Sequence, residues 1–261
     1  MKLLALILAY IISHSISQPH RFRRFDWYKS WVDWFTSRVQ WSVSELTIIA
    51  IIAVPVILIN FIFVSLVDSE LGRLLVSIVI LSYCIGPKSL EEDVDSGNIR
   101  SKLNVRKNAK VAVLIKKMTQ VSLQRWFGIF FWYVVLGVVG ALIYRLSERL
   151  DFFTSKDNEN KSSIETLMRI LNYPVAWMMV FSLAIASDFE RIFKRCKAYM
   201  SIKNIKSMDD TFLYEAADFA VEICEVEPES QLSIEEVTIN VLKRMLIVWL
   251  VFVSILVILA A

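Results

Sequence analysis

Long runs of uncharged, apolar residues alternate with charged stretches along this chain. The clearest run extends from Trp126 to Tyr144, where nineteen uncharged residues precede Arg145. At ~1.5 Å per residue, a helix of this length approaches the ~30 Å thickness of the hydrocarbon core of a bilayer. Further runs occupy residues 46–67, 74–86, 170–187 and 245–261, with a weaker one at 3–17. The pattern predicts an all-α, polytopic membrane helix bundle with about 4 to 6 membrane helices.

Composition agrees with this class, because 56% of the 261 residues are hydrophobic and the mean hydropathy is +0.53. One soluble core could not cover so much apolar surface. Residues 3–17 and 71–86 are short for a full crossing, so spanning and re-entrant arrangements both stay open for them. No small-x-small cleavage site precedes Gln18, so we expect a retained first membrane helix rather than a removed signal peptide.

The positive charges indicate how the chain is oriented in the membrane. Nine Lys and Arg residues lie in residues 87–125 and eight in residues 188–244, and inserted helices leave most of their positive charge in the cytoplasm. The five Lys and Arg residues of 18–45 are expected on the same side, whereas Lys2, Arg73 and the five Lys and Arg residues from Arg145 to Arg169 are expected on the opposite side. We expect a single integral membrane domain over residues 1–261, in the cell inner (plasma) membrane, with the loops 87–125 and 188–242 cytoplasmic.

Periodic apolar positions predict amphipathic helices inside these loops. One helix is expected over residues 105–123, with an apolar face made of Val111, Leu114, Ile115 and Met118. A second should begin after Ser207, with Phe212, Ala216, Phe219 and Ile223 on one face. Ser233 and Glu236 form a capping-box pattern, and no breaker follows before the end of the chain. The last helix should therefore run for about thirty residues.

Residues 21–41 mix aromatic and basic side chains, with Trp27, Trp31 and Trp34 at helical spacing. Such a mixture is typical of the lipid headgroup boundary. It could also stack single-stranded nucleic acid, but the neighbouring membrane helices favour lipid. The lipid bilayer is therefore the expected partner, and no nucleic-acid partner is expected.

The apolar runs contain one notable amide, Asn60, and no Asp, Glu, Lys or His chain for proton coupling. Pro55 lies in the same run, where neighbouring helices can satisfy the carbonyl that it frees. An Asn amide can join two membrane helices through a hydrogen bond. We interpret Asn60 as a helix contact rather than a polar pathway, which disfavours a small-solute transporter.

The sequence lacks the residue sets of common catalytic sites. Only His14 and His20 are present, which excludes a Ser-His-Asp triad or a histidine-rich metal site, and no P-loop pattern occurs. Two acidic groups are interpreted as solvated faces rather than metal ligands; they are Glu91, Glu92, Asp93 and Asp95, and Glu225, Glu227 and Glu229. The three cysteines, Cys84, Cys196 and Cys224, have no metal or disulfide spacing. We therefore expect no cofactor, metal or catalytic residue.

The stretch FWYVVLGVVGALIYR, Phe131 to Arg145, resembles the F-W-Y-x-x-L-G-x-x-G-A-x-x-Y-(K/R) segment of the CobD/CbiB membrane proteins, and AmpE proteins share a looser form of it. Residues 84–90, CIGPKSL, look like the G-x-(R/K)-S-L end of a membrane helix in that family. Residues 171–174, LNYP, are similar to its (N/D)-W-x-P segment. The matching positions, which we interpret as structural, are Gly86, Lys88, Ser89, Trp132, Tyr133, Gly137, Gly140, Tyr144, Arg145, Asn172 and Pro174.

Departures from the family pattern separate two branches. CobD/CbiB synthases join an amino-alcohol phosphate to a corrinoid carboxylate with ATP, and they share an A-E-N-x-x-D-G run before F-W-Y. Here Gln120, Val121 and Gln124 stand at the Glu, Asn and Asp positions, and Ala176 with Trp177 replaces an arginine after W-x-P. A synthase needs charge near its phosphates and an acid or base near its amine.

The chain therefore looks like the AmpE branch, whose members are inner-membrane proteins associated with β-lactamase induction, the response to antibiotic and cell-wall recycling in Gram-negative bacteria. The resemblance implies a non-catalytic signalling protein, with another membrane or cell-wall recycling protein as a candidate partner. The alternative is a CobD/CbiB-like adenosylcobinamide-phosphate synthase of cobalamin biosynthesis whose polar residues have moved, to Lys88, Glu91 or Glu92.

Overall fold

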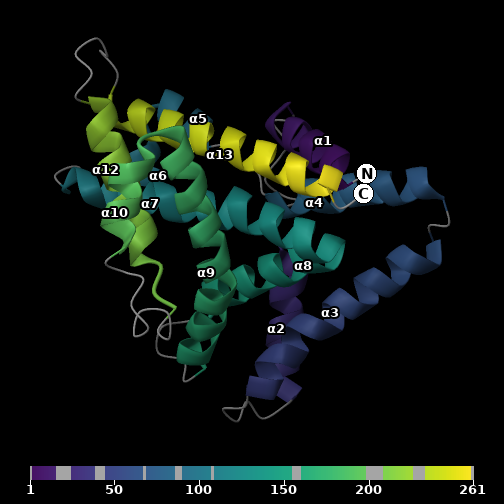
Figure 1. Cartoon of the computed structure of the whole chain (residues 1–261). Coiled ribbons are helices and arrows are strands. Elements are labelled where there is room, and N and C mark those ends of the chain that lie inside the picture. Colours follow the sequence, from purple (N-terminus) through teal and green to yellow (C-terminus); the bar gives the residue numbers. More distant parts are fainter. Residues whose placement is uncertain are drawn as a thin grey trace. The chain divides into compact units, whose positions relative to one another are not determined.

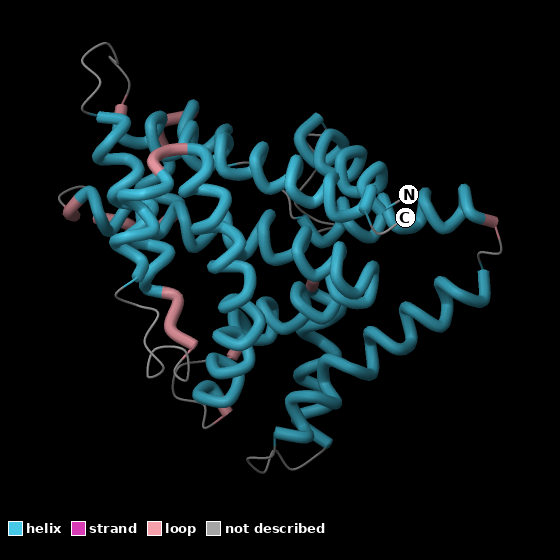
Figure 2. Tube along the Cα trace, viewed as in Figure 1, coloured by secondary structure: helices cyan, strands magenta, loops and turns pink. Residues whose placement is uncertain are grey.

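The structure, a computed structural model, is predominantly helical in the residues that it describes, and no strand occurs among them (Figures 1 and 2). The described residues are 2–15, 25–38, 45–66, 69–85, 90–106, 109–154, 160–197, 208–225 and 233–259. The predicted all-α class is confirmed.

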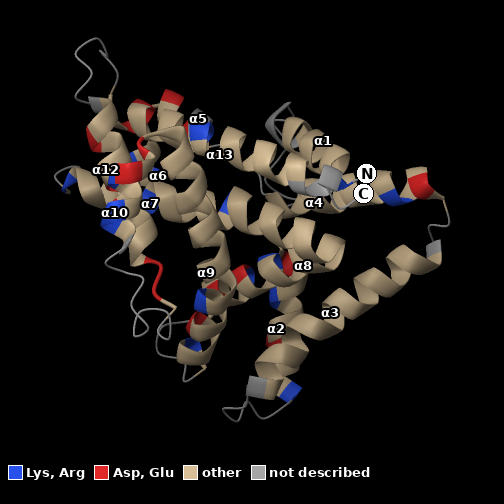
Figure 3. Cartoon of the chain, in the orientation of Figure 1, with Lys and Arg blue, Asp and Glu red and all other residues tan. Residues whose placement is uncertain are grey.

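Four helical segments in this part of the chain are long and apolar enough to cross a membrane. They are Leu46–Ser65, Val111–Phe153, Lys161–Ala186 and Ile234–Ile255. The first lies within α3 (Glu45–Leu66), which Figure 3 shows free of charged side chains along its apolar part. The predicted polytopic membrane class is therefore confirmed. Two shorter helices, α1 (Lys2–Ser15) and α4 (Glu70–Ile85), correspond to the two short apolar runs.

By their contacts the residues form two compact units, 1–87 with 128–171 and 88–127 with 172–261. In the first unit, α1 packs along α4, and α8 (Gly128–Phe153) is contacted by α1, α3, α4 and α2 (Asp26–Arg38). Side chains that are almost completely buried form its core, namely Leu6, Ile51, Leu81, Phe130 and Tyr144. The aromatic helix α2 keeps Trp27 and Trp34 about half exposed.

Helix α8 is not one straight rod, which corrects the expectation of an uninterrupted helix from Trp126 to Arg145. Gly137 interrupts it with φ 68° and ψ −152°, a conformation that is essentially restricted to glycine. A Cβ atom placed on Gly128 would lie 2.1 Å from the ring of Tyr144, although sixteen residues of straight helix would separate the two backbones by ~24 Å. The chain therefore reverses at Gly137 into a helical hairpin (Figure 1).

Glycines permit the close approach of the two hairpin arms. A Cβ atom on Gly140 would lie 2.2 Å from the carbonyl oxygen of Trp132, a backbone atom that cannot be displaced cheaply. Small residues have this role in membrane helix pairs because they let backbones touch. Gly140 thus allows the close approach of two arms of the same helix, whereas Gly137 has no atom within 4 Å of a Cβ position and contributes its positive φ instead.

In the second unit, α7 (Val111–Ser122), α12 (Thr211–Glu225) and α13 (Ile234–Leu259) contact one another. The predicted start of α13 is confirmed, because Ser233 Oγ accepts a hydrogen bond from the Glu236 N–H while the Glu236 carboxylate accepts one from the Ser233 N–H. Arg100, in α6 (Ile99–Lys102), forms an ion pair with Glu235 in the first turn of α13, with 2.8 Å between Arg100 Nε and Glu235 Oε1.

The faces of the amphipathic helices differ in part from the prediction. Helix α7 begins at Val111 rather than near residue 105, and Val111 is exposed while Leu114, Ile115 and Met118 are buried. On α12 the buried positions are Phe212, Leu213, Ala216, Ala217, Ala220 and Val221. Phe219 and Ile223 are only half-buried, because the packed face is rotated toward Leu213, Ala217 and Ala220, which come one position after Phe212, Ala216 and Phe219.

Candidate functional site

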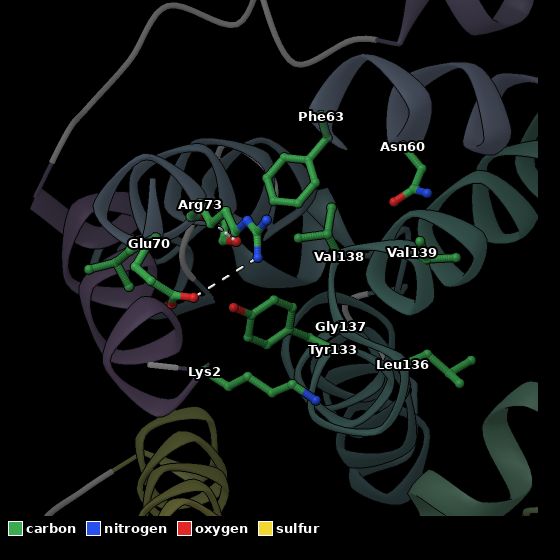
Figure 4. A pocket seen from close by; sticks show the side chains of 12 residues that line it. Lys2, Asn60, Phe63, Glu70, Arg73, Tyr133, Leu136, Gly137, Val138 and Val139 are labelled. Atoms are coloured by element: carbon green, nitrogen blue, oxygen red, sulfur yellow. Dashed lines mark hydrogen bonds and ion pairs between the residues drawn. The ribbon is translucent and has the colours of Figure 1, made fainter. Parts of the chain in front are cut away.

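A cavity of about 370 Å³ lies beside the reversal of α8 in the first unit (Figure 4). Helices α1, α3, α4 and α8 each contribute to its wall. The lining residues are Lys2, Asn60, Phe63, Glu70, Arg73, Leu74, Ser77, Tyr133, Leu136, Gly137, Val138 and Val139. This volume is in the range of ordinary small-molecule sites, ~300–1,000 Å³.

The backbone at Gly137 explains why polar groups gather here. The reversal leaves carbonyl groups at the end of the first arm and N–H groups at the start of the second without partners in their own arm. In the apolar part of a membrane protein, such backbone is tolerated where protein covers it or where it lines a wet cavity. Gly137, Val138 and Val139 line the cavity, so the second arm begins at its wall.

One of the charged side chains satisfies part of this backbone. The Lys2 ammonium group donates to the Val134 carbonyl oxygen at 3.3 Å, three residues before the reversal. A cation at the C-terminal end of a helix is stabilised by the helix dipole as well as by the hydrogen bond. Lys2 thus connects the first residues of α1 to the end of the first arm.

Helix α4 contributes an ion pair and the Ser77 hydroxyl group to the wall, and α8 contributes the Tyr133 hydroxyl group. Arg73 and Glu70 on α4 approach to 4.0 Å, and both side chains are more than half exposed at the cavity mouth. Ser77 Oγ donates to the Arg73 carbonyl oxygen at 2.7 Å. In Figure 4, the Tyr133 ring lies between Lys2 and the Glu70–Arg73 pair. The cavity therefore combines two cations, one carboxylate and the polar groups of Asn60, Ser77 and Tyr133 with apolar side chains.

The family-motif positions in α8 divide between the cavity and the hairpin packing. Tyr133 and Gly137 line the cavity. Trp132 Nε1 donates to the Leu171 carbonyl oxygen at 3.1 Å, which joins the F-W-Y segment to the first residue of LNYP. Tyr144 is fully buried against Gly128. These contacts, together with that of Gly140, are structural in character.

Arg145 lies outside the cavity, in a separate buried cluster. Its side chain is 1% exposed and forms an ion pair with Glu148 at 3.0 Å. The same carboxylate oxygen lies 3.2 Å from Arg149 Nε in a second ion pair, and both guanidinium groups lie 5.4 Å from the ring of Phe25. The cluster anchors the segment before α2 to the second arm.

The remaining predicted positions do not join the cavity. Asn172 is buried in the second unit, and Pro174 lies inside α9 (Lys161–Ala186). Gly86, Lys88 and Ser89 lie outside the described residues, as do the side chains of Glu91 and Glu92. Gln120, at the synthase glutamate position, contacts Lys117 at 3.5 Å. Gln124 lies in a π-helical turn, η1 (Leu123–Phe127).

Neither acidic group forms a metal site in the described part of the chain, where no cluster of three or more His, Cys, Asp or Glu side chains occurs. Asp93 is buried in an ion pair with Lys102. Residues 226–232, which include Glu227 and Glu229, lie outside the description. Cys84, Cys196 and Cys224 are free thiols.

Residue patterns alone did not reveal Lys2, Glu70, Arg73 and Ser77 as site residues. The one signal in the sequence was the charge-based orientation, which placed Lys2 and Arg73 on the same face of the membrane. Comparisons of the chain with protein-family models, curated proteins and solved structures found no match. The AmpE resemblance therefore rests on its short motifs.

Proposed function

We propose that this chain is a non-catalytic, multi-pass inner-membrane protein of AmpE type, which modulates β-lactamase induction and cell-wall recycling signalling. The proposal rests on the resemblance of Phe131 to Arg145 to that family. It places the loops 87–125 and 188–242 in the cytoplasm, where another membrane or cell-wall recycling protein is the candidate partner.

One structural observation supports the non-catalytic branch in particular. The motif residues that the chain keeps, above all Gly137 and Gly140, are those that a helical hairpin requires for steric reasons. The polar residues that a synthase would need before F-W-Y are replaced by Gln120, Val121 and Gln124. The residues that this chain shares with the family pattern are thus those that shape the helices, and the polar groups that a reaction would need are not among them.

Contacts within each unit support the proposed orientation. In the second unit, α7 of the first basic loop packs against α12 of the second, with the Lys116 ammonium group 5.0 Å from the ring of Tyr214. This contact favours one membrane side for both loops. In the first unit, Lys2 and Arg73 line the same cavity, in line with a common opposite side for the starts of α1 and α4.

The functional test is deletion of the gene in a β-lactam-inducible strain that encodes it. We expect altered β-lactamase activity after exposure to a subinhibitory β-lactam, restored by the wild-type gene but not by a Gly140→Ala variant that loses the hairpin. Unchanged induction in the deletion strain would contradict the AmpE-type role.

A second experiment addresses the alternative directly. The purified full chain in detergent is incubated with ATP, a corrinoid acid and an amino-alcohol phosphate, and product is followed by mass spectrometry. We expect no turnover. Product formation would overturn the non-catalytic assignment and establish the synthase alternative.

A further inference from the structure

We propose that the Gly137 cavity binds a small organic anion, with a phosphate or carboxylate group between Lys2 and Arg73 and an apolar part against Phe63 and Leu136. This inference goes beyond the AmpE-type role and does not depend on it. It rests on the cavity, its charges and the broken backbone that forms one wall.

The charges favour an anion. Two cations reach the cavity from different helices, Lys2 from α1 and Arg73 from α4, against the single carboxylate of Glu70. A lysine ammonium group has three N–H donors, and the Val134 carbonyl takes one of them. Arg73 contributes a planar group whose N–H donors match phosphate and carboxylate oxygens.

The backbone adds a second positive contribution. The second arm of α8 starts at Val138, so its first N–H groups have no helical acceptor and carry the positive end of the helix dipole. Broken membrane helices use this arrangement toward anionic groups of their ligands. Here the start of the second arm lies at the wall of a cavity that also contains two cationic side chains. A helix end alone would provide neither.

The apolar part of the wall determines the class of anion. Phe63, Leu74, Leu136, Val138 and Val139 provide a surface that a fully hydrated inorganic ion would leave unused. A ligand with a short hydrocarbon portion would bury that surface at ~25 cal/mol per Å². The same chemistry is available from a soluble organic phosphate or carboxylate and from an anionic lipid headgroup.

The experiment uses the full chain, purified in detergent and then placed in nanodiscs of phosphatidylcholine. Hexyl phosphate is the probe, inorganic phosphate is the comparison, and the rise in unfolding temperature with concentration gives the apparent affinity. We expect saturable stabilisation by hexyl phosphate at lower concentrations than by inorganic phosphate. Absence of saturable stabilisation would overturn the proposal.

Charge variants test whether the probe binds in this cavity. Each variant is compared with its own unliganded unfolding temperature, so that a change in stability is not mistaken for a change in affinity. Lys2→Gln and Arg73→Gln should each weaken hexyl phosphate binding by about tenfold, since each removes a cation close to the ligand. Glu70→Gln should strengthen binding several-fold. Lys29→Gln, an exposed lysine on α2 outside the cavity, should leave the affinity unchanged. Weaker binding by Glu70→Gln, or equal effects of all four variants, would refute the assignment.

Nanodiscs that also contain phosphatidylglycerol distinguish the two sources. If the lipid headgroup occupies the cavity, hexyl phosphate should no longer stabilise the wild-type chain in these discs, while Lys29→Gln behaves like wild type. If the natural ligand is soluble, stabilisation should be the same in both kinds of disc. Either result supports anion binding in the cavity and identifies the natural ligand as a lipid headgroup or a soluble anion.

Discussion

The reversal of α8 makes a quantitative prediction for Gly128 and Tyr144. A Cβ atom on Gly128 would lie 2.1 Å, 2.3 Å and 2.4 Å from the Cζ, Oη and Cε1 atoms of Tyr144. Tyr144 is fully buried, so its ring has no open space to enter. Overpacking of this kind costs ~1–3 kcal/mol. Gly128→Ala should therefore lower the free energy of unfolding by about that amount.

A double-mutant cycle tests whether the cost depends on the hairpin. In a Tyr144→Leu background the alanine methyl group meets no ring, so Gly128→Ala should then cost much less. The coupling energy between the two sites should be ~1–3 kcal/mol. Tyr144→Phe is the matched control, because it keeps the Cζ and Cε1 atoms and should relieve little of the clash. Val135→Ala, an exposed position of the first arm, should change stability by less than ~0.5 kcal/mol.

The assay is unfolding of each purified variant in detergent micelles, followed by far-ultraviolet circular dichroism. In a straight helix the two residues would be ~24 Å apart, and their effects would add within ~0.3–0.5 kcal/mol. Additive effects would therefore refute the hairpin.

Three further predictions concern the second unit. Ser233→Ala should lower stability by ~1 kcal/mol in unfolding experiments, because it removes the side-chain cap of α13; an unchanged stability would mean that the capping box contributes nothing. Burial raises the pKa of the Asp210 carboxyl group, so the native state binds the carboxyl proton more tightly than the unfolded chain does. The free energy of unfolding should therefore fall as the pH rises from the pKa of Asp210 in the unfolded chain to its raised pKa in the native state. Asp210→Asn should flatten that part of the stability profile, and a profile identical to wild type would contradict the assignment. Burial raises the pKa of Cys196 to about 11, so near neutral pH a maleimide should label Cys224, which is partly exposed, well before Cys196; faster labelling of Cys196 would contradict its burial.

Much of the fold could be predicted from local signals. The start of α13 follows from Ser233 and Glu236, because a capping box is formed by residues three apart and needs no distant partner. The run that became α3 is apolar on all sides, which suffices to predict a membrane helix despite Pro55. The buried face of α12 was less accurate, because rotation of a helix by one residue depends on the surface against which it packs.

The candidate site was only partly predictable. Tyr133 and Gly137 were identified as family-motif positions, yet their common place on a cavity wall depends on the reversal of α8. Lys2 and Arg73 carry no sequence pattern that points to a site. They reach the cavity because α1 and α4 pack side by side.

The sequence by itself determined that this protein is an all-α, polytopic membrane protein, since long uncharged runs leave few other ways to bury apolar side chains and satisfy backbone groups. Only the tertiary structure decided the path of the run that contains Gly137. Hydropathy does not distinguish a straight helix from a hairpin, because both have the same composition. Glycine at position 137 permits the reversal, and the fit of Gly128 to Tyr144 and of Gly140 to Trp132 selects it.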